Sequence, residues 1–288
     1  MMGKDRKLND RTRQQIKLVP PRQGLAWLMQ SLALIRAQTG RLLLLVVLLQ
    51  LIMGLTQVPL IGFLLILSVP ALTAGLLQGF HVTSLGGRPI PTLLFVPLTS
   101  KGHAGRLFGL GGLMFLVGIT CVAMLLPADS ALTDPELISR IEQGDVEALS
   151  ALDMDSLRSM LFAFLIGLSI SGTLSFMTIP LVWFQNRPLG PAILIGLKAL
   201  VVNWKPFLVL GLGLAGVLIP VSLVAGALFA SASGGGAFSM LVMAVVMLLV
   251  LVFQLLLFGT QYCSFRDIFR LEVDSEQTEP PDDSQLVA

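Results

Sequence analysis

The fold of this chain is decided by LLLLVVLLQLIMGLTQVPLIGFLLILSVPALTAGLLQGF, residues 42–80, which contains no charged side chain. As one helix this stretch would be nearly 60 Å long at about 1.5 Å per residue, roughly twice the hydrocarbon thickness of a bilayer. Pro59 lies in its middle, within the segment TQVPLIG (56–62). Because proline breaks a helix and the stretch is too long for one crossing, we predict two spans, 42–57 and 61–80, joined by a tight turn.

Four later apolar runs are each long enough to cross a bilayer, at 106–126, 158–184, 206–230 and 238–262. A turn with three consecutive glycines separates the last two runs. The residues AVILMFWYC make up 55% of the 288 residues and charged residues only 12%, against about 25% charged in a soluble domain. The sequence therefore predicts an all-α fold, a polytopic transmembrane helical bundle with six spans and interfacial helices.

The lysines and arginines predict the orientation of these spans. All of them except Arg140 and Arg158 precede the first span, follow the sixth, or lie between spans two and three or four and five. Basic residues mark the cytoplasmic side, so both termini are expected in the cytoplasm. The Trp and Tyr residues fall near span ends on the same side, which suggests a one-sided aromatic belt of Trp27, Trp183, Trp204 and Tyr262.

The chain divides into a basic cytoplasmic tail (1–19), a membrane domain (20–262) and a cytoplasmic tail (263–288). The second tail is acidic and contains prolines, so part of it is expected to be disordered. Residues 127–157 form the outward loop, which is acidic through Asp129, Asp134, Glu136, Glu142, Asp145, Glu147, Asp153 and Asp155. The spacing and glycine of a calcium loop are absent there, which favours a solvated acidic face over a cation site.

Residues 23–38 place leucine and isoleucine side chains on one helical face: Leu25, Leu28, Leu32 and Ile35. This pattern predicts a helix that either lies in the membrane interface or packs on the core. Similar segments precede spans three and five, and both open with Arg-Pro, at Arg88 and Arg187. We therefore consider three repeats, each an interfacial segment and a span pair, at about 20–80, 88–184 and 187–262.

Chemistry-bearing residues are rare within the predicted spans, which contain no Asp or Glu; their polar side chains include Gln50, Cys121, Gln254 and scattered Ser and Thr. Proton- or sodium-coupled carriers commonly keep an ionisable group at membrane depth. The two histidines, His81 and His103, fall near the cytoplasmic face without nearby acids and make a weak metal site. No catalytic motif is recognisable, so we expect no enzyme activity, no metal and no cofactor.

Three segments carry a resemblance to known proteins: VPPRQGLAWLMQSLALIR (19–36), PLIGFLLILSVPALTAGL (59–76) and NWKPFLVLGL (203–212). Over residues 18–265 the chain resembles an uncharacterised family of proteobacterial multi-pass inner-membrane proteins. The pattern of interfacial helix and span pair is distantly similar to the membrane domain attached to some glycerophosphodiester phosphodiesterases. No phosphodiesterase catalytic domain is present, so that activity does not transfer. The resemblance implies a bacterial inner membrane and no established activity.

Two functions are compatible with these features of the sequence. The first is a non-enzymatic envelope or partner-binding protein, whose partners are the lipid bilayer and a second copy or another membrane protein, with no nucleic acid. The alternative is an uncoupled carrier or facilitator for a lipid or a small apolar solute. A carrier predicts a polar or lipid-sized cavity between spans three, four and five, whereas a partner-binding protein predicts co-purification with a defined protein.

Overall fold

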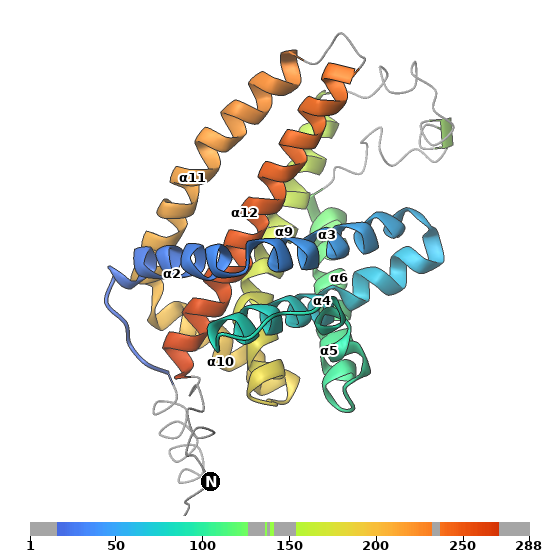
Figure 1. Ribbon diagram of the computed structural model, residues 1–288. Helices are drawn as coiled ribbons and strands as arrows, with labels where there is room; N and C mark the ends of the chain where they lie inside the picture. The colour runs from blue at the N-terminus through green and yellow to red at the C-terminus, as the bar shows by residue number, and fades with distance from the viewer. Residues whose placement is uncertain (1–15, 126–135, 137–138, 141–153, 232–236, 271–288) are drawn as a thin grey trace, which may run out of the picture.

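The computed structural model describes residues 16–125, 136, 139–140, 154–231 and 237–270, and every regular element within these ranges is helical. The long helices are α2 (Gln23–Ala37), α3 (Thr39–Gly54), α4 (Pro59–Ser84), α6 (His103–Leu125), α9 (Met154–Phe184), α10 (Leu189–Val202), α11 (Trp204–Ser231) and α12 (Ala237–Phe269). Three short turns of helix are η1 (Leu55–Gln57), η2 (Pro91–Leu94) and α5 (Val96–Thr99). The prediction of an all-α bundle is confirmed (Figure 1).

Six helical stretches are long and apolar enough to cross a membrane: Thr39–Gln57, Leu60–Ser84, His103–Leu125, Leu157–Phe184, Trp204–Ala230 and Phe238–Phe269. Each overlaps one of the six predicted runs, and the chain is an integral multi-pass membrane protein. Most of the predicted acidic loop lies outside the described residues. The same holds for the glycine turn at 232–236 and for both ends of the chain.

The predicted turn between the first two spans is present, and local chemistry explains it. Val58 is extended, with φ −89° and ψ 116°, and Pro59 takes a first-turn position of α4, where no amide donor is needed. Thr56 Oγ1 donates to the Met53 carbonyl at 2.6 Å. A Cβ at Gly62 would collide with the Thr56 carbonyl, so only glycine lets the two helices turn this sharply.

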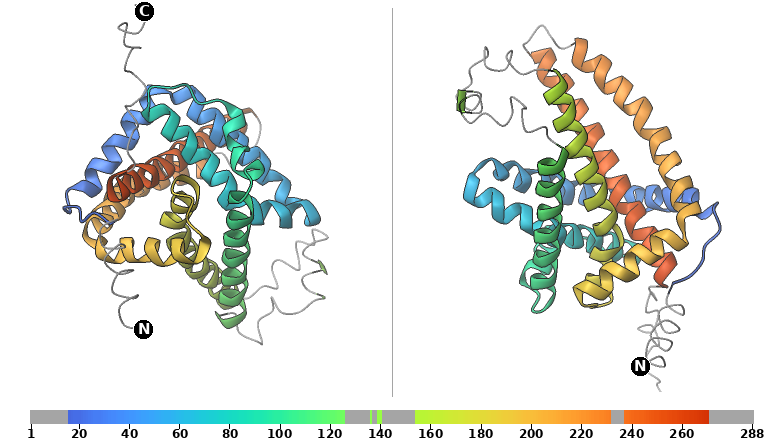
Figure 2. Two further views of the ribbon diagram at one scale, coloured as in Figure 1. Left: turned by 90° about the horizontal axis from the view of Figure 1, so that it is seen from below. Right: turned by 180° about the vertical axis from the view of Figure 1, so that it is seen from behind.

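Three helix pairs form the bundle: α3–α4, α6–α9 and α11–α12. Their second members, α4, α9 and α12, contact one another at the centre. The segment before each pair packs on the second helix of another pair: α2 on α12, η2 and α5 on α4, and α10 on α9. These contacts close a ring in the order expected for three repeated units. The pairs diverge from a shared end, and α3–α4 runs across the direction of α11 and α12 (Figures 1 and 2).

We call that shared end the basic end; there α4, α9 and α12 finish and α6 and α11 begin. The opposite ends of α6, α9, α11 and α12 form the far end (Figure 2). Each central helix is followed by a residue with positive φ, namely Gly86 (76°), Asn186 (50°) and Arg270 (47°). A left-handed residue is a common helix stop, so the three helices end in the same way.

Helix α2 packs on the core, as one of the two alternatives left open by its sequence expects. It buries Gly24, Trp27, Leu28, Ser31 and Ile35 against α11 and α12. A Cβ at Gly24 would meet the backbone carbonyl of Pro206, so the contact is between backbones. The predicted apolar face is therefore only partly right, because Leu25 is 48% exposed.

The last helix is longer than predicted, since α12 continues past residue 262 to Phe269. The charges of Arg266 and Asp267 do not end it because its inner face stays apolar and buried through Phe265 and Ile268. Asp267 therefore lies within a candidate span, contrary to the prediction that no carboxylate does. The first tail also packs from residue 16 on, where the Lys17 amide donates to the Ile268 carbonyl at 2.9 Å.

Candidate functional site

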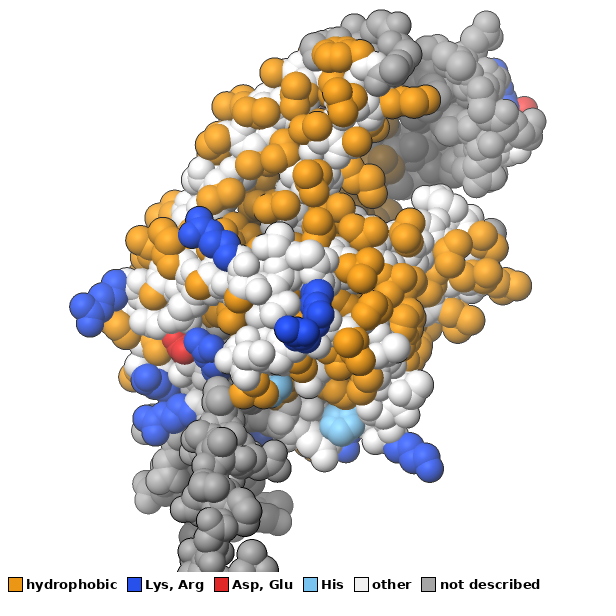
Figure 3. Space-filling view, in the orientation of Figure 1, with side chains coloured by type: hydrophobic (Ala, Val, Ile, Leu, Met, Phe, Trp, Pro, Cys, Tyr) orange, Lys and Arg blue, Asp and Glu red, His pale blue; other side chains and the backbone are white. Residues whose placement is uncertain are grey.

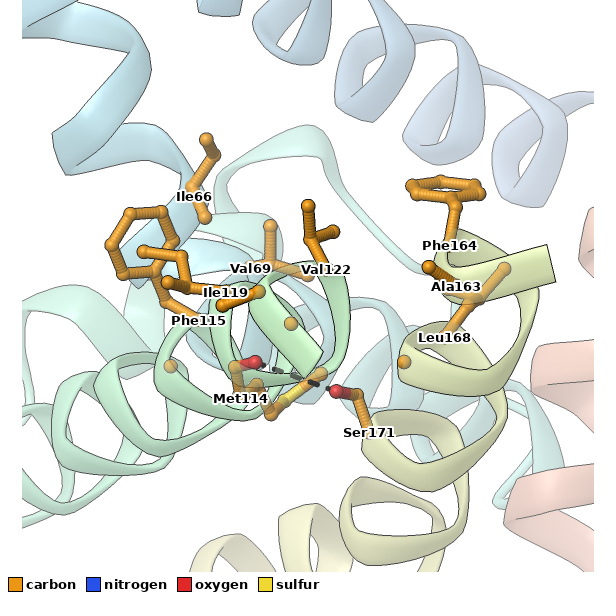
Figure 4. A pocket seen from close by; sticks show the side chains of 14 residues that line it. Ile66, Val69, Met114, Phe115, Ile119, Val122, Ala163, Phe164, Leu168 and Ser171 are labelled. Atoms are coloured by element: carbon orange, nitrogen blue, oxygen red, sulfur yellow. Dashed lines mark hydrogen bonds between the residues drawn. The ribbon is translucent and has the colours of Figure 1, made fainter. Parts of the chain in front are cut away.

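An apolar groove of about 570 Å³ lies between α4, α6 and α9, and we call it the first groove. Its size falls within the range of about 300–1,000 Å³ typical of small-molecule sites. Figure 4 shows α4 and α6 side chains on one side and α9 side chains on the other. The lining consists of Ile66, Val69, Gly111, Met114, Phe115, Gly118, Ile119, Val122, Ala123, Ala163, Phe164, Gly167, Leu168 and Ser171.

Glycines create this groove by letting helices approach at two places and by leaving space at a third. A Cβ at Gly111 would collide with the Leu67 carbonyl of α4, so α4 and α6 touch through backbone there. A Cβ at Gly167 would lie 3.5 Å from the Cα of Gly118, which brings α9 against α6. A Cβ at Gly118 would itself meet nothing within 4 Å, because it would project into open space.

The groove offers a ligand no charge and no available polar side chain. Ser171 is the one lining residue with a polar side-chain group, and its hydroxyl donates to the Met114 carbonyl at 3.4 Å across the base of the groove (Figure 4). Several lining side chains are also exposed on the outside of the bundle, such as Phe164 at 59% and Leu168 at 57%. The groove is therefore open at the surface of the bundle rather than enclosed within it.

A second groove, of about 480 Å³, lies between α9, α10 and α11, nearer the basic end. With 3.6 residues per turn, its α9 residues project from the face of that helix opposite to the first groove. Ser169 and Thr173 bond back to carbonyls of their own helix at 2.7 and 2.8 Å, so this lining is also apolar in effect. The lining residues are Ser169, Gly172, Thr173, Phe176, Leu200, Phe207, Leu210, Gly211 and Leu214.

The cavity expected for a carrier is thus found in a different place. It was predicted between spans three, four and five, whereas the larger groove joins spans two, three and four. The smaller one lies between spans four and five. A Cβ at Gly111 of α6 would meet α4, whereas a Cβ at Gly105, Gly118 or Gly211 would meet open space. The glycines of spans three and four were the available sequence signal for the first groove.

Polar side chains cluster at the basic end, where they join helices to one another. The Tyr262 hydroxyl of α12 lies 2.7 Å from Ser84 Oγ and 3.0 Å from His81 Nδ1, both on α4. Asp267 accepts hydrogen bonds from Gln23 at 2.6 Å and from Trp27 Nε1 at 2.9 Å. These bonds tie α12 to α4 and to α2.

The prediction of a one-sided aromatic belt is wrong for two of its four residues. Trp27 and Tyr262 are fully buried, because the indole N–H of Trp27 and the hydroxyl of Tyr262 form their hydrogen bonds inside the bundle. Trp183 is half-buried and donates to Gln78 at 2.9 Å. Trp204, at 57% exposed, is the one of the four that is largely exposed.

The two histidines have different neighbours. His81 packs on Phe184, with ring centroids 5.3 Å apart, whereas His103 packs on Trp183 at 5.3 Å. Across the described ranges, no three His, Cys, Asp or Glu side chains gather where they could hold a metal ion. The two cysteines lie apart in packing positions, Cys121 near Gly167 of α9 and Cys263 buried in the core.

Comparison with known proteins adds no assignment. No protein-family model, no curated protein and no solved structure matches this chain.

Proposed function

We propose that this membrane protein binds the hydrocarbon chain of a lipid, or a similar apolar solute, in the first groove and acts as an uncoupled facilitator. The observation that carries the proposal is the lining, which is apolar apart from a hydroxyl already bonded to the Met114 carbonyl. A polar solute would lose its hydration there without gaining partners. The proposed setting is the bacterial inner membrane, with both termini in the cytoplasm.

Uncoupled action follows from the same lining. Coupling to protons requires a group that changes its charge at membrane depth. The first groove has no Asp, Glu, His, Lys or Arg among its lining residues. Movement of the solute would then follow its own gradient, and no enzymatic step is proposed.

Selectivity in this groove must come from shape. Lipid tails surround the protein and are as apolar as its lining, so burial from water gives no advantage to one bound chain. Close packing between the ring of Phe115, the ring of Phe164 and the glycine positions can give that advantage, because dispersion contacts add up over a well-fitted chain. Binding should therefore be saturable, unlike contact with bulk lipid.

A photoactivatable fatty acid, reconstituted with the protein in phosphatidylcholine vesicles, tests this proposal. Crosslinked peptides mapped by mass spectrometry should come mainly from α6 and α9, and an excess of unlabelled fatty acid should remove them. Gly118→Leu should abolish these crosslinks, since its side chain fills the groove without meeting a neighbour within 4 Å at Cβ. The matched control is Gly226→Leu in α11, where a Cβ also meets open space outside both grooves.

Crosslinks that cannot be competed away, or that fall equally on α11, would show ordinary lipid contact and end the proposal. The partner-binding role remains a separate proposal. Its test is reproducible co-purification of one defined membrane protein after mild solubilisation.

A further inference from the structure

The second groove ends at the corner where α10 meets α11, and this corner is rigidly built. Asn203 is 1% exposed and separates the two helices. Its Oδ1 accepts the Val19 amide at 3.0 Å, and its Nδ2 donates to the Lys17 carbonyl at 3.2 Å. The segment that leads into α2 is therefore fixed against the corner.

Besides Lys17, a second cation, Arg22, lies at this corner, immediately before helix α2. Gly24 touches the backbone of Pro206, which places Arg22, two residues earlier, beside the start of α11. Phe207 connects this corner to the groove, because it lines the groove and packs on Trp27 with ring centroids 5.2 Å apart. The mouth of the groove and the basic corner are therefore continuous.

Three exposed cations lie on the segments that meet at this corner: Lys17, Arg22 and Lys205. The Lys205 ammonium lies 5.8 Å from the centroid of the exposed Trp204 ring. The nearby acid, Asp267, accepts hydrogen bonds from Gln23 and Trp27 and lies 3.9 Å from Arg266, so it is already compensated. Figure 3 shows lysine and arginine side chains gathered around one acidic side chain at this end, beside apolar surface.

We propose that the corner and the second groove together bind one anionic phospholipid. One hydrocarbon chain lies along Phe207, Gly211 and Leu214, and the phosphate lies among Lys17, Arg22 and Lys205. Charge complementarity selects the lipid headgroup, and the adjoining apolar groove distinguishes a lipid from a soluble anion. The first groove has no such cations, so this site is separate and does not depend on the facilitator function proposed above.

Native mass spectrometry of the protein reconstituted in equal amounts of phosphatidylglycerol and phosphatidylcholine, then extracted in mild detergent, tests the site. The wild-type protein should retain phosphatidylglycerol in preference to phosphatidylcholine, and added salt should reduce the preference. Replacing Lys17, Arg22 and Lys205 with Ala should lower the preference by about fivefold per cation removed. Lys17→Arg with Lys205→Arg should keep it.

The groove is tested separately with Gly211→Leu, whose Cβ meets open space in the groove lining. This variant should lose the retained phosphatidylglycerol, whereas Gly226→Leu, farther along α11, should keep it. Equal retention of both lipids by the wild-type protein would overturn the proposal. So would an undiminished preference in the triple Ala variant. Full retention by Gly211→Leu would place the lipid outside the groove and refute the site as described.

Discussion

Replacing Asp267 with Ala tests how α2 is held on the bundle. The carboxylate accepts hydrogen bonds from Gln23 at 2.6 Å and from Trp27 at 2.9 Å. Trp27 is 0% exposed, so its indole N–H would lose its partner without reaching water, at a cost of about 1–3 kcal/mol. Gln23 is only half-buried and can turn to water, so its bond adds little. We expect a total loss of about 1–3 kcal/mol in the free energy of unfolding.

A double-mutant cycle with Trp27→Phe isolates the indole bond. Phenylalanine keeps an aromatic ring against Phe207 but removes the donor. Asp267→Ala should therefore destabilise the Trp27→Phe protein by about 1–2 kcal/mol less than it destabilises the wild type. Reversible unfolding in mixed micelles with sodium dodecyl sulfate, followed by circular dichroism, measures the four proteins.

Asp267→Asn is the control, since its amide oxygen can still accept one bond and should retain part of the stability. If Asp267→Ala were equally destabilising in both backgrounds, the indole bond would contribute nothing and the reasoning would be wrong.

Three further predictions concern other parts of the molecule. Gly111→Ala should destabilise the protein by about 1–3 kcal/mol in the same assay, because its Cβ would meet a backbone carbonyl of α4; an unchanged stability would show that α6 can shift freely. Gln254→Leu should raise the free energy of unfolding by about 1 kcal/mol, because the buried Oε1 has no partner within the described part of the chain; a fall would reveal a partner. A reporter fused after Ala288 should be active in the cytoplasm and one inserted near Gly144 outside it, whereas the opposite pair of results would reverse the predicted orientation.

The helices could be predicted from the sequence because a bilayer imposes simple requirements on any chain that crosses it. A charge-free run such as 42–80 must be helical and must turn once, and Pro59 marks the place. The side chains at the basic end could not be placed in this way. A tryptophan suits both a lipid–water boundary and a buried position with an acceptor. The acceptor of Trp27 lies 240 residues away in sequence.

The location of the grooves could likewise not be predicted from the sequence. The position of a groove depends on which helices pack against one another. Gly111 brings α6 against α4, and no local sequence pattern predicts that contact. The glycines of α6 are visible in the sequence, but their spacing does not identify the helix that packs against them. A single glycine, such as Gly118, carries the same sequence signal whether it faces a helix or a groove.

The ring of contacts sets an order of events during biosynthesis. Helix α2 leaves the ribosome before every other helix described, and its binding partners α11 and α12 are the last two to be made. Until they arrive, Trp27 and Ser31 have no acceptor, since Asp267 and the Leu256 carbonyl both belong to α12. The bundle can therefore close only after translation has passed residue 267. A chain arrested earlier would leave the normally buried face of α2 exposed. Proteases and insertion factors would recognise that exposed face.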